Sequence, residues 1–112
     1  MPPETQSALM TMARSSSREV CGFIDKDWEV HPIKNVAVND RDFKMDEQEQ
    51  IEFFRNYFTV MTGVYHSHPG GRREPSEKDI TYAPARLRYW IVTRTEVIEW
   101  EIKDGVATEV TA

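Results

Sequence analysis

The sequence predicts an α/β domain of the α+β type, in which a mixed β-sheet is flanked by helices. Two segments carry apolar residues at helical spacing, several shorter apolar segments read as strands, and Gly, Pro and Asp separate them. The expected order is helix, strands, helix, strand, helix, strands, which favours helices packed against a mixed sheet. The 112 residues suffice for one core, so we expect a single domain over residues 1–112.

Three helices are expected. Residues 5–14 place Leu9 and Met12 on one apolar stripe, as in a short amphipathic helix. Residues 46–58 repeat apolar side chains at helical spacing and begin with acidic residues, which suit the positive end of a helix dipole. A third, short helix is expected over residues 76–82, after a loop rich in Gly and Pro.

The remaining apolar segments predict strands. They are residues 19–24, 28–33, 59–66, 89–93, 97–102 and 106–110. Gly22 lies inside the first strand, which predicts a close approach of another part of the chain. Pro32 predicts that the second strand lies at an edge of the sheet. Asp104 and Gly105 predict a hairpin turn between the last two strands.

Composition excludes several functions. The formal net charge is -5, and an acidic protein without clustered Lys and Arg is not expected to bind nucleic acid. The N-terminal residues do not resemble a signal peptide, and no apolar run has the roughly 20 residues of a membrane span. We therefore expect a cytoplasmic protein. The single cysteine, Cys21, excludes an intrachain disulfide and lies in an apolar run, where a buried thiol is a poor nucleophile.

The strongest chemical signal is the pair His66 and His68, followed by a loop and then Asp79. Alternate residues of a strand point to one face, so the two imidazoles lie about 6.6 Å apart at their Cα atoms and can converge on one ion. Two imidazoles and one carboxylate are a ligand set of catalytic zinc, with water in the fourth position. Ser76 shares a helix face with Asp79.

Each of these residues also has a structural interpretation. The two histidines fit a half-exposed strand, and His31 is interpreted as an ordinary surface histidine. Residues 76–79 fit a helix capping box, a role that is compatible with catalysis. Glu19 alone reads as a solvated strand end, although zinc hydrolysis needs a base and a carboxylate is the usual choice. The conjunction of paired histidines, glycine loop and helical acid favours the metal site.

Together, Glu19, His66-x-His68 and Ser76-x-x-Asp79, with seven residues between His68 and Ser76, resemble the JAMM motif of the JAB/MPN metallopeptidase family. The resemblance covers residues 7 to about 100. It implies a cytidine-deaminase-like fold, one Zn²⁺ per chain bound by His66, His68 and Asp79, and Glu19 as the base for the metal's water. Ser76 would help to stabilise the oxyanion.

The resemblance implies a hydrolase that cleaves a peptide or isopeptide bond. The chain lacks the insertions with which eukaryotic members grip ubiquitin, so it is similar to compact prokaryotic or phage JAB domains. Three functions follow as expectations. The first is a peptidase for a ubiquitin-like or other protein tail. The second is a phage tail peptidase acting on cell-wall peptides, which would be associated with tail proteins and the virion. The third is a catalytically silent binding or scaffold module, which the intact motif disfavours.

Overall fold

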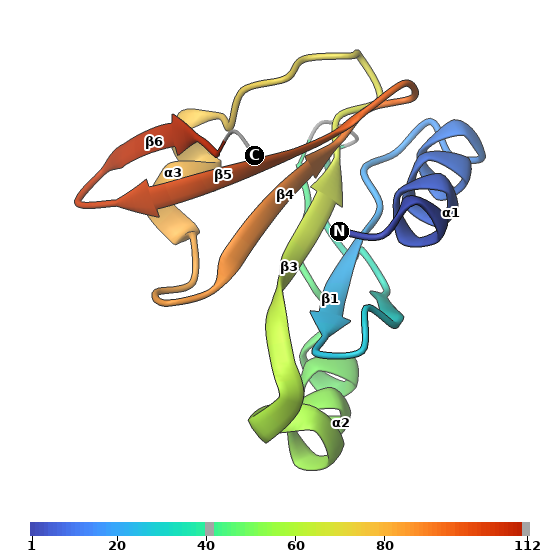
Figure 1. Ribbon diagram of the computed structural model, residues 1–112, viewed down its shortest axis with the longest axis vertical. Coiled ribbons are helices and arrows are strands. Elements are labelled where there is room, and N and C mark those ends of the chain that lie inside the picture. Colours follow the sequence, from blue (N-terminus) through green and yellow to red (C-terminus); the bar gives the residue numbers. More distant parts are fainter. Residues whose placement is uncertain (40–41, 111–112) are drawn as a thin grey trace.

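The computed structural model describes residues 1–39 and 42–110. Its framework is a six-stranded sheet in the order β2-β1-β3-β4-β5-β6, with helices beside it (Figure 1). The elements in chain order are α1 (Pro3–Arg14), β1 (Cys21–Asp25), β2 (Val30–Ile33), α2 (Glu47–Tyr57), the 3₁₀ turn η1 (Phe58–Val60), β3 (Met61–Ser67), α3 (Glu77–Tyr82), β4 (Arg88–Val92), β5 (Val97–Lys103) and β6 (Val106–Glu109). Strands β3 and β4 are parallel and the other neighbours are antiparallel, so the predicted mixed α+β fold is confirmed.

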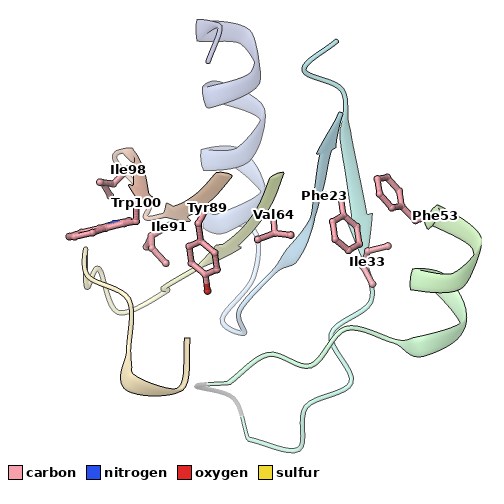
Figure 2. Packing of buried hydrophobic residues seen from close by; sticks show 8 residues of the cluster. All are labelled: Phe23, Ile33, Phe53, Val64, Tyr89, Ile91, Ile98 and Trp100. Carbon is pink, nitrogen blue, oxygen red and sulfur yellow. The ribbon is translucent and has the colours of Figure 1, made fainter. Parts of the chain in front are cut away.

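The two faces of the sheet hold separate apolar clusters, because successive strand residues point to opposite sides. One cluster packs against α1 and includes Leu9 of the helix and Tyr65 of β3. The other, shown in Figure 2, packs against α2 and includes Val64 of β3. There the ring of Phe53 stacks on Phe23 at a centroid distance of 4.4 Å. Helices α1 and α2 therefore cover opposite faces of the sheet.

Three strands begin two residues later than the sequence predicts, and the other strand boundaries agree to within one residue. The strand expected from residue 19 begins at Cys21, so Glu19 lies just before it. The strand expected from residue 28 begins at Val30, because Trp28 has a φ of 62° and forms part of a turn. The strand expected from residue 59 begins at Met61, after a 3₁₀ turn. Apolar side chains fill turns as well as strands, and the sequence pattern does not separate the two.

The local predictions from Gly and Pro are confirmed. Pro32 lies in β2, which is an edge strand. A Cβ atom on Gly22 would lie 2.3 Å from the carbonyl oxygen of His31, so only glycine fits this approach between β1 and β2. Asp104 and Gly105 have φ values of 52° and 76°, the left-handed pair that a tight hairpin requires.

The interpretation of His31 as an ordinary surface residue is wrong. Its Nε2 lies 2.8 Å from Oδ2 of Asp25, and only 20% of its side chain is exposed. Its ring also packs on Tyr57 at a centroid distance of 4.4 Å. His31 thus joins β2 to α2 and to the last residue of β1, and it contributes to the structure and not to the metal site.

Among residues 1–39 and 42–110, no helix combines the length and the apolar character that crossing a membrane requires.

Candidate metal centre

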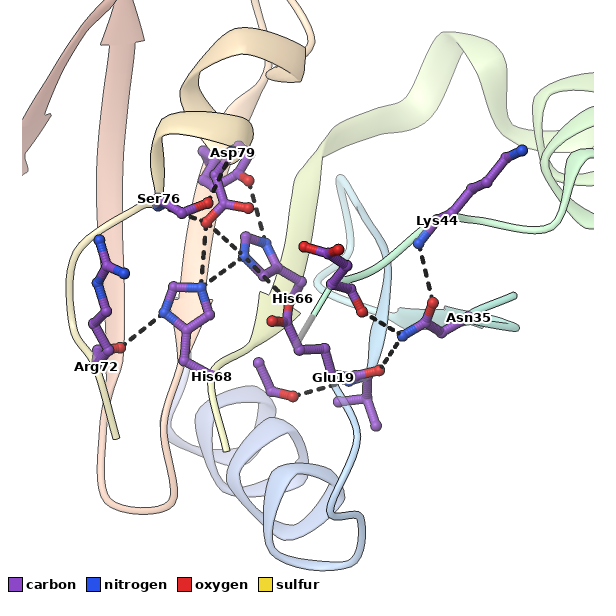
Figure 3. A network of polar contacts seen from close by, with 12 residues as sticks. Glu19, Asn35, Lys44, His66, His68, Arg72, Ser76 and Asp79 are labelled. Carbon is purple, nitrogen blue, oxygen red and sulfur yellow. Dashed lines mark hydrogen bonds and ion pairs between the residues drawn. The ribbon is translucent and has the colours of Figure 1, made fainter. Parts of the chain in front are cut away.

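Two histidines converge at the C-terminal end of β3. His66 and His68 are two residues apart and project from the same face of the sheet as Val64, the face that α2 covers. Pairing with β4 continues past the strand end, because the backbone N–H of His68 donates to the carbonyl of Val92 at 2.9 Å. His66 is fully buried and His68 is 8% exposed. Both imidazoles therefore lie in one buried site at the end of β3 (Figure 3).

Asp79 completes a triangle of atoms with the two histidines. The Nε2 atoms of His66 and His68 are 3.1 Å apart, and each is 3.2 Å from Oδ2 of Asp79. The carboxylate comes from α3 and is oriented by the capping box: Ser76 N–H donates to Oδ2 at 2.8 Å, and Asp79 N–H donates to Ser76 Oγ at 3.0 Å. The predicted capping box is thus confirmed, and it positions the carboxylate.

The loop between β3 and α3 sets the orientation of His68. Gly71 has a φ of 86°, a conformation that suits glycine, and its N–H donates to the carbonyl of His68 at 2.9 Å. This turn places the carbonyl of Arg72 2.9 Å from Nδ1 of His68. A carbonyl oxygen can only accept, so Nδ1 carries a proton, and in the neutral imidazole the lone pair lies on Nε2.

The triangle fits a tetrahedral zinc ion. With zinc bonds of about 2.0–2.1 Å, two ligand atoms at the tetrahedral angle lie about 3.3 Å apart, close to the three distances found here. In a neutral His68 with its proton on Nδ1, the Nε2 lone pair and the carboxylate of Asp79 face each other at 3.2 Å and repel, whereas a proton on Nε2 makes the same contact a hydrogen bond. A shared cation removes that repulsion, so the chemistry of the donor atoms and their spacing both suit a metal ion.

Glu19 lies beside the triangle but farther from it. Its Oε1 is 3.9 Å from Nε2 of His66, and it forms with His66 and His68 a buried group whose ligand atoms lie within 4.8 Å of one another. This group could itself hold a metal. A second ligand on the same tetrahedron as His66 would lie about 3.3 Å away. The distance from Oε1 of Glu19 to Nε2 of His66 exceeds this value, whereas the 3.2 Å from Oδ2 of Asp79 is close to it.

Hydrogen bonds with two residues, Ser67 and Asn35, position the backbone at Glu19 and Val20. Val20 N–H donates to Ser67 Oγ at 2.8 Å, and Ser67 N–H donates to the Val20 carbonyl at 2.9 Å. The side chain of Asn35 donates to the Glu19 carbonyl at 2.9 Å. The chain before β1 is therefore attached both to β3 and to the segment after β2, and this arrangement directs a strand-end acid into the site.

The electrostatic environment differs among the site residues. Burial raises the pKa of Glu19 to about 8. Burial also acts to raise the pKa of Asp79, but hydrogen bonds with His66 and His68 outweigh it and hold the pKa of this carboxyl well below its usual range. Burial lowers the pKa of His66, which favours the neutral imidazole that binds metals. For His68, burial is outweighed by the bonds to Asp79 and Arg72, so its pKa is raised.

A groove of about 740 Å³ opens beside Asp79 on the α2 face of the sheet. Its lining is mainly apolar, as at Phe54, Leu87 and Tyr89. The segment after β2 borders the groove and reaches the site, where the ring of Phe43 stacks on His66 at 4.3 Å. The groove therefore borders the candidate metal centre at Asp79.

The structure brings together all the residues that the sequence singled out: Glu19, His66, His68, Ser76 and Asp79 (Figure 3). Sequence reasoning missed Asn35, Phe43 and Tyr89, which support or border them. Within the described residues, the side chain of Asn35 makes four hydrogen bonds to the backbone, at Glu19, Ala37, Asp42 and Lys44. A single Asn shortly after a strand is common in loops, and Phe43 and Tyr89 read as core residues, so the sequence contained no signal for these contacts.

Comparison with known proteins adds one finding. A family model described as prokaryotic homologs of the JAB domain matches residues 2–103. No curated protein matches the sequence. The matched range includes every residue of the candidate metal centre.

Proposed function

The chain belongs to the family of prokaryotic homologs of the JAB domain, and we propose that it is a zinc-dependent hydrolase that cleaves a peptide or isopeptide bond. The observation that carries the proposal is the triangle of His66, His68 and Asp79, whose sides of 3.1 and 3.2 Å match the ligand spacing of tetrahedral zinc. A catalytic zinc site keeps one position open for water. Glu19 lies beside the triangle, with Oε1 3.9 Å from Nε2 of His66.

The residues have separate roles in this proposal. When bound, Zn²⁺ acidifies a water molecule and polarises the substrate carbonyl. Glu19 accepts the proton of the attacking water and delivers it to the leaving amine. Burial raises the pKa of Glu19 to about 8, close to the working pH, so the carboxylate that accepts the proton and the carboxyl that returns it are both accessible near neutral pH. Ser76 Oγ accepts a hydrogen bond from Asp79 N–H and keeps its own proton for donation to the oxyanion.

The groove supports an extended polypeptide as substrate. It is mainly apolar and borders Asp79, so a chain lying in it would present a backbone carbonyl to the metal centre and a large apolar side chain to Phe54 and Leu87. A flexible protein tail, such as that of a ubiquitin-like protein, meets this requirement because it can be threaded without unfolding a domain. A peptide library with one varied position would show preference for large apolar residues on one side of the cleaved bond.

The test separates the base from the ligands. Protein purified without added metal should contain about one zinc per chain. Glu19→Gln should keep its zinc and its fold but lose most hydrolysis of a peptide library, whereas His68→Ala should lose the zinc. If Glu19→Gln releases zinc as completely as His68→Ala, the metal ligands are Glu19, His66 and His68, and the role given to Glu19 is wrong.

Three outcomes would redirect the proposal. Failure of the purified chain to bind zinc on titration would refute the metal centre. Zinc at one equivalent with no cleavage of peptides, ubiquitin-like tails or cell-wall peptides would favour the catalytically silent module. Cleavage of cell-wall peptides alone would favour the role of a phage tail peptidase.

A further inference from the structure

The second ring nitrogen of His66 has its own partner. Nδ1 of His66 lies 3.2 Å from the hydroxyl oxygen of Tyr89. Tyr89 lies on β4, which runs parallel to β3, and it pairs with Val64, so its ring projects from the same face as His66. Both residues are buried, Tyr89 being 3% exposed and His66 fully enclosed. Bulk solvent therefore has little access to this bond, although Tyr89 also lines the groove.

His66 is also confined between two rings. Phe43 stacks on one face of the imidazole at a centroid distance of 4.3 Å and an interplanar angle of 24°. The ring of Tyr89 meets the imidazole edge to face, at 5.4 Å and 78°. The stacking limits rotation of the imidazole, and the contact of Nδ1 with the hydroxyl of Tyr89 favours the ring orientation in which Nε2 faces the triangle.

We propose that Tyr89 is a positioning residue that holds His66 with Nε2 directed to the metal centre and, when the metal is bound, accepts the proton of Nδ1. This inference rests on the proposed zinc site. Metal-binding histidines usually donate their other N–H to an acceptor that fixes the ring and its tautomer. Here the acceptor is the phenol oxygen. Loss of it would leave a buried N–H without a partner in the metal-binding tautomer, which costs free energy and opposes metal binding.

The two histidines differ in this support. The carbonyl of Arg72 only accepts, so it holds His68 in the metal-binding tautomer at all times. The hydroxyl of Tyr89 both accepts and donates, so it bonds to Nδ1 of His66 in either tautomer. In the metal-free protein Nε2–H of His66 can donate to Asp79 while Tyr89 donates to Nδ1. When a metal binds, the hydrogen bond between Tyr89 and Nδ1 of His66 changes direction, with Nδ1–H as donor, and neither ring has to move. The site therefore keeps its arrangement with and without metal.

The test uses a matched pair of tyrosines. Tyr89→Phe removes the hydroxyl that contacts His66. Tyr65→Phe is the control, because within residues 1–39 and 42–110 the Tyr65 hydroxyl is buried without a hydrogen-bond partner, and Tyr65 points to the opposite face of the sheet. For each protein, Zn²⁺ affinity is measured by competition with a chelator, the melting temperature is measured without metal, and imidazole NMR reports which nitrogen of His66 carries the proton.

We expect Tyr89→Phe to weaken Zn²⁺ binding about 10- to 100-fold, and Tyr65→Phe to leave it unchanged within about twofold while keeping or raising stability. In the zinc-loaded parent, NMR should show a hydrogen-bonded proton on Nδ1 of His66. Equal zinc affinity in folded Tyr89→Phe and in the parent would overturn the role of Tyr89 and leave the zinc site standing. An unprotonated or solvent-exchanging Nδ1 of His66 in the zinc-loaded parent would do the same, and this measurement does not depend on whether the variant folds. A parent that binds no zinc would overturn the proposed function as well.

Discussion

Substitution of Ser76 separates the two roles that its hydroxyl has in this structure. Ser76 Oγ accepts a hydrogen bond from Asp79 N–H at 3.0 Å, which caps α3. The same oxygen is proposed to donate to the oxyanion. The backbone N–H of Ser76, which orients Oδ2 of Asp79 at 2.8 Å, is retained by any residue except proline. Side-chain variants therefore change the cap and the oxyanion donor while keeping the strongest support of the metal ligand.

The two roles predict effects of different size. Loss of the cap in Ser76→Ala should cost about 1 kcal/mol of stability, which corresponds to a fall in melting temperature of about 4 °C for a domain of this size. Loss of one oxyanion donor should raise the barrier by about 3 kcal/mol, or at least about a hundredfold in rate. Ser76→Asp keeps a good capping group but puts a negative charge where the oxyanion develops.

The assay is a pair of measurements on each variant: the melting temperature, and turnover of any peptide that the parent cleaves, with Glu19→Gln as the inactive reference. We expect Ser76→Asp to keep nearly the parent's melting temperature and to be almost inactive. Ser76→Ala should lose a similar amount of activity and only a little stability. Near-parental turnover in Ser76→Asp would refute the oxyanion role and leave Ser76 as a helix cap.

Three further predictions concern residues outside the metal centre. Gly22→Ala should destabilise the protein by about 1–3 kcal/mol or more in chemical denaturation, since its Cβ would lie 2.3 Å from the His31 carbonyl; an unchanged midpoint would show that β2 moves away freely. Burial raises the pKa of Cys21 to about 12, so a thiol reagent at pH 8 should label it only after denaturant is added, and rapid labelling of the native protein would contradict its burial. Burial acts to raise the pKa of Asp25, but hydrogen bonds with His31 and with the N–H groups of Glu29 and Asp27 outweigh it and hold this pKa below its ordinary 3.8. The contribution of Asp25 to stability is therefore complete above pH 3.8 and is lost as the pH falls below that value. Asp25→Asn should reduce the acid sensitivity of the melting temperature, and an unchanged pH profile would refute this assignment.

Local spacing was sufficient to predict much of the molecule. His66 and His68 share a face because alternate strand residues do, and this holds wherever the strand lies. The capping box of Ser76 and Asp79 depends only on residues three apart in a helix. Pro32 restricts its strand to an edge, and Asp104 with Gly105 forms a hairpin, because backbone conformation and hydrogen-bonding capacity are properties of the residues themselves. These features were predicted correctly before any contact between distant segments was known.

The long-range contacts required the folded chain. Glu19 lies before its strand and reaches the site only because Ser67 and Asn35 hold the backbone around it. Tyr89 has the sequence pattern of a core residue, and its hydroxyl meets His66 because β3 and β4 are parallel neighbours. His31 was misinterpreted for the same reason, since its partner Asp25 lies across a turn. Strand order and the placement of loops depend on how the whole chain buries its apolar surface. A local pattern therefore predicts which residues could take part in a reaction or bind a metal, and the tertiary structure establishes which of them lie close together.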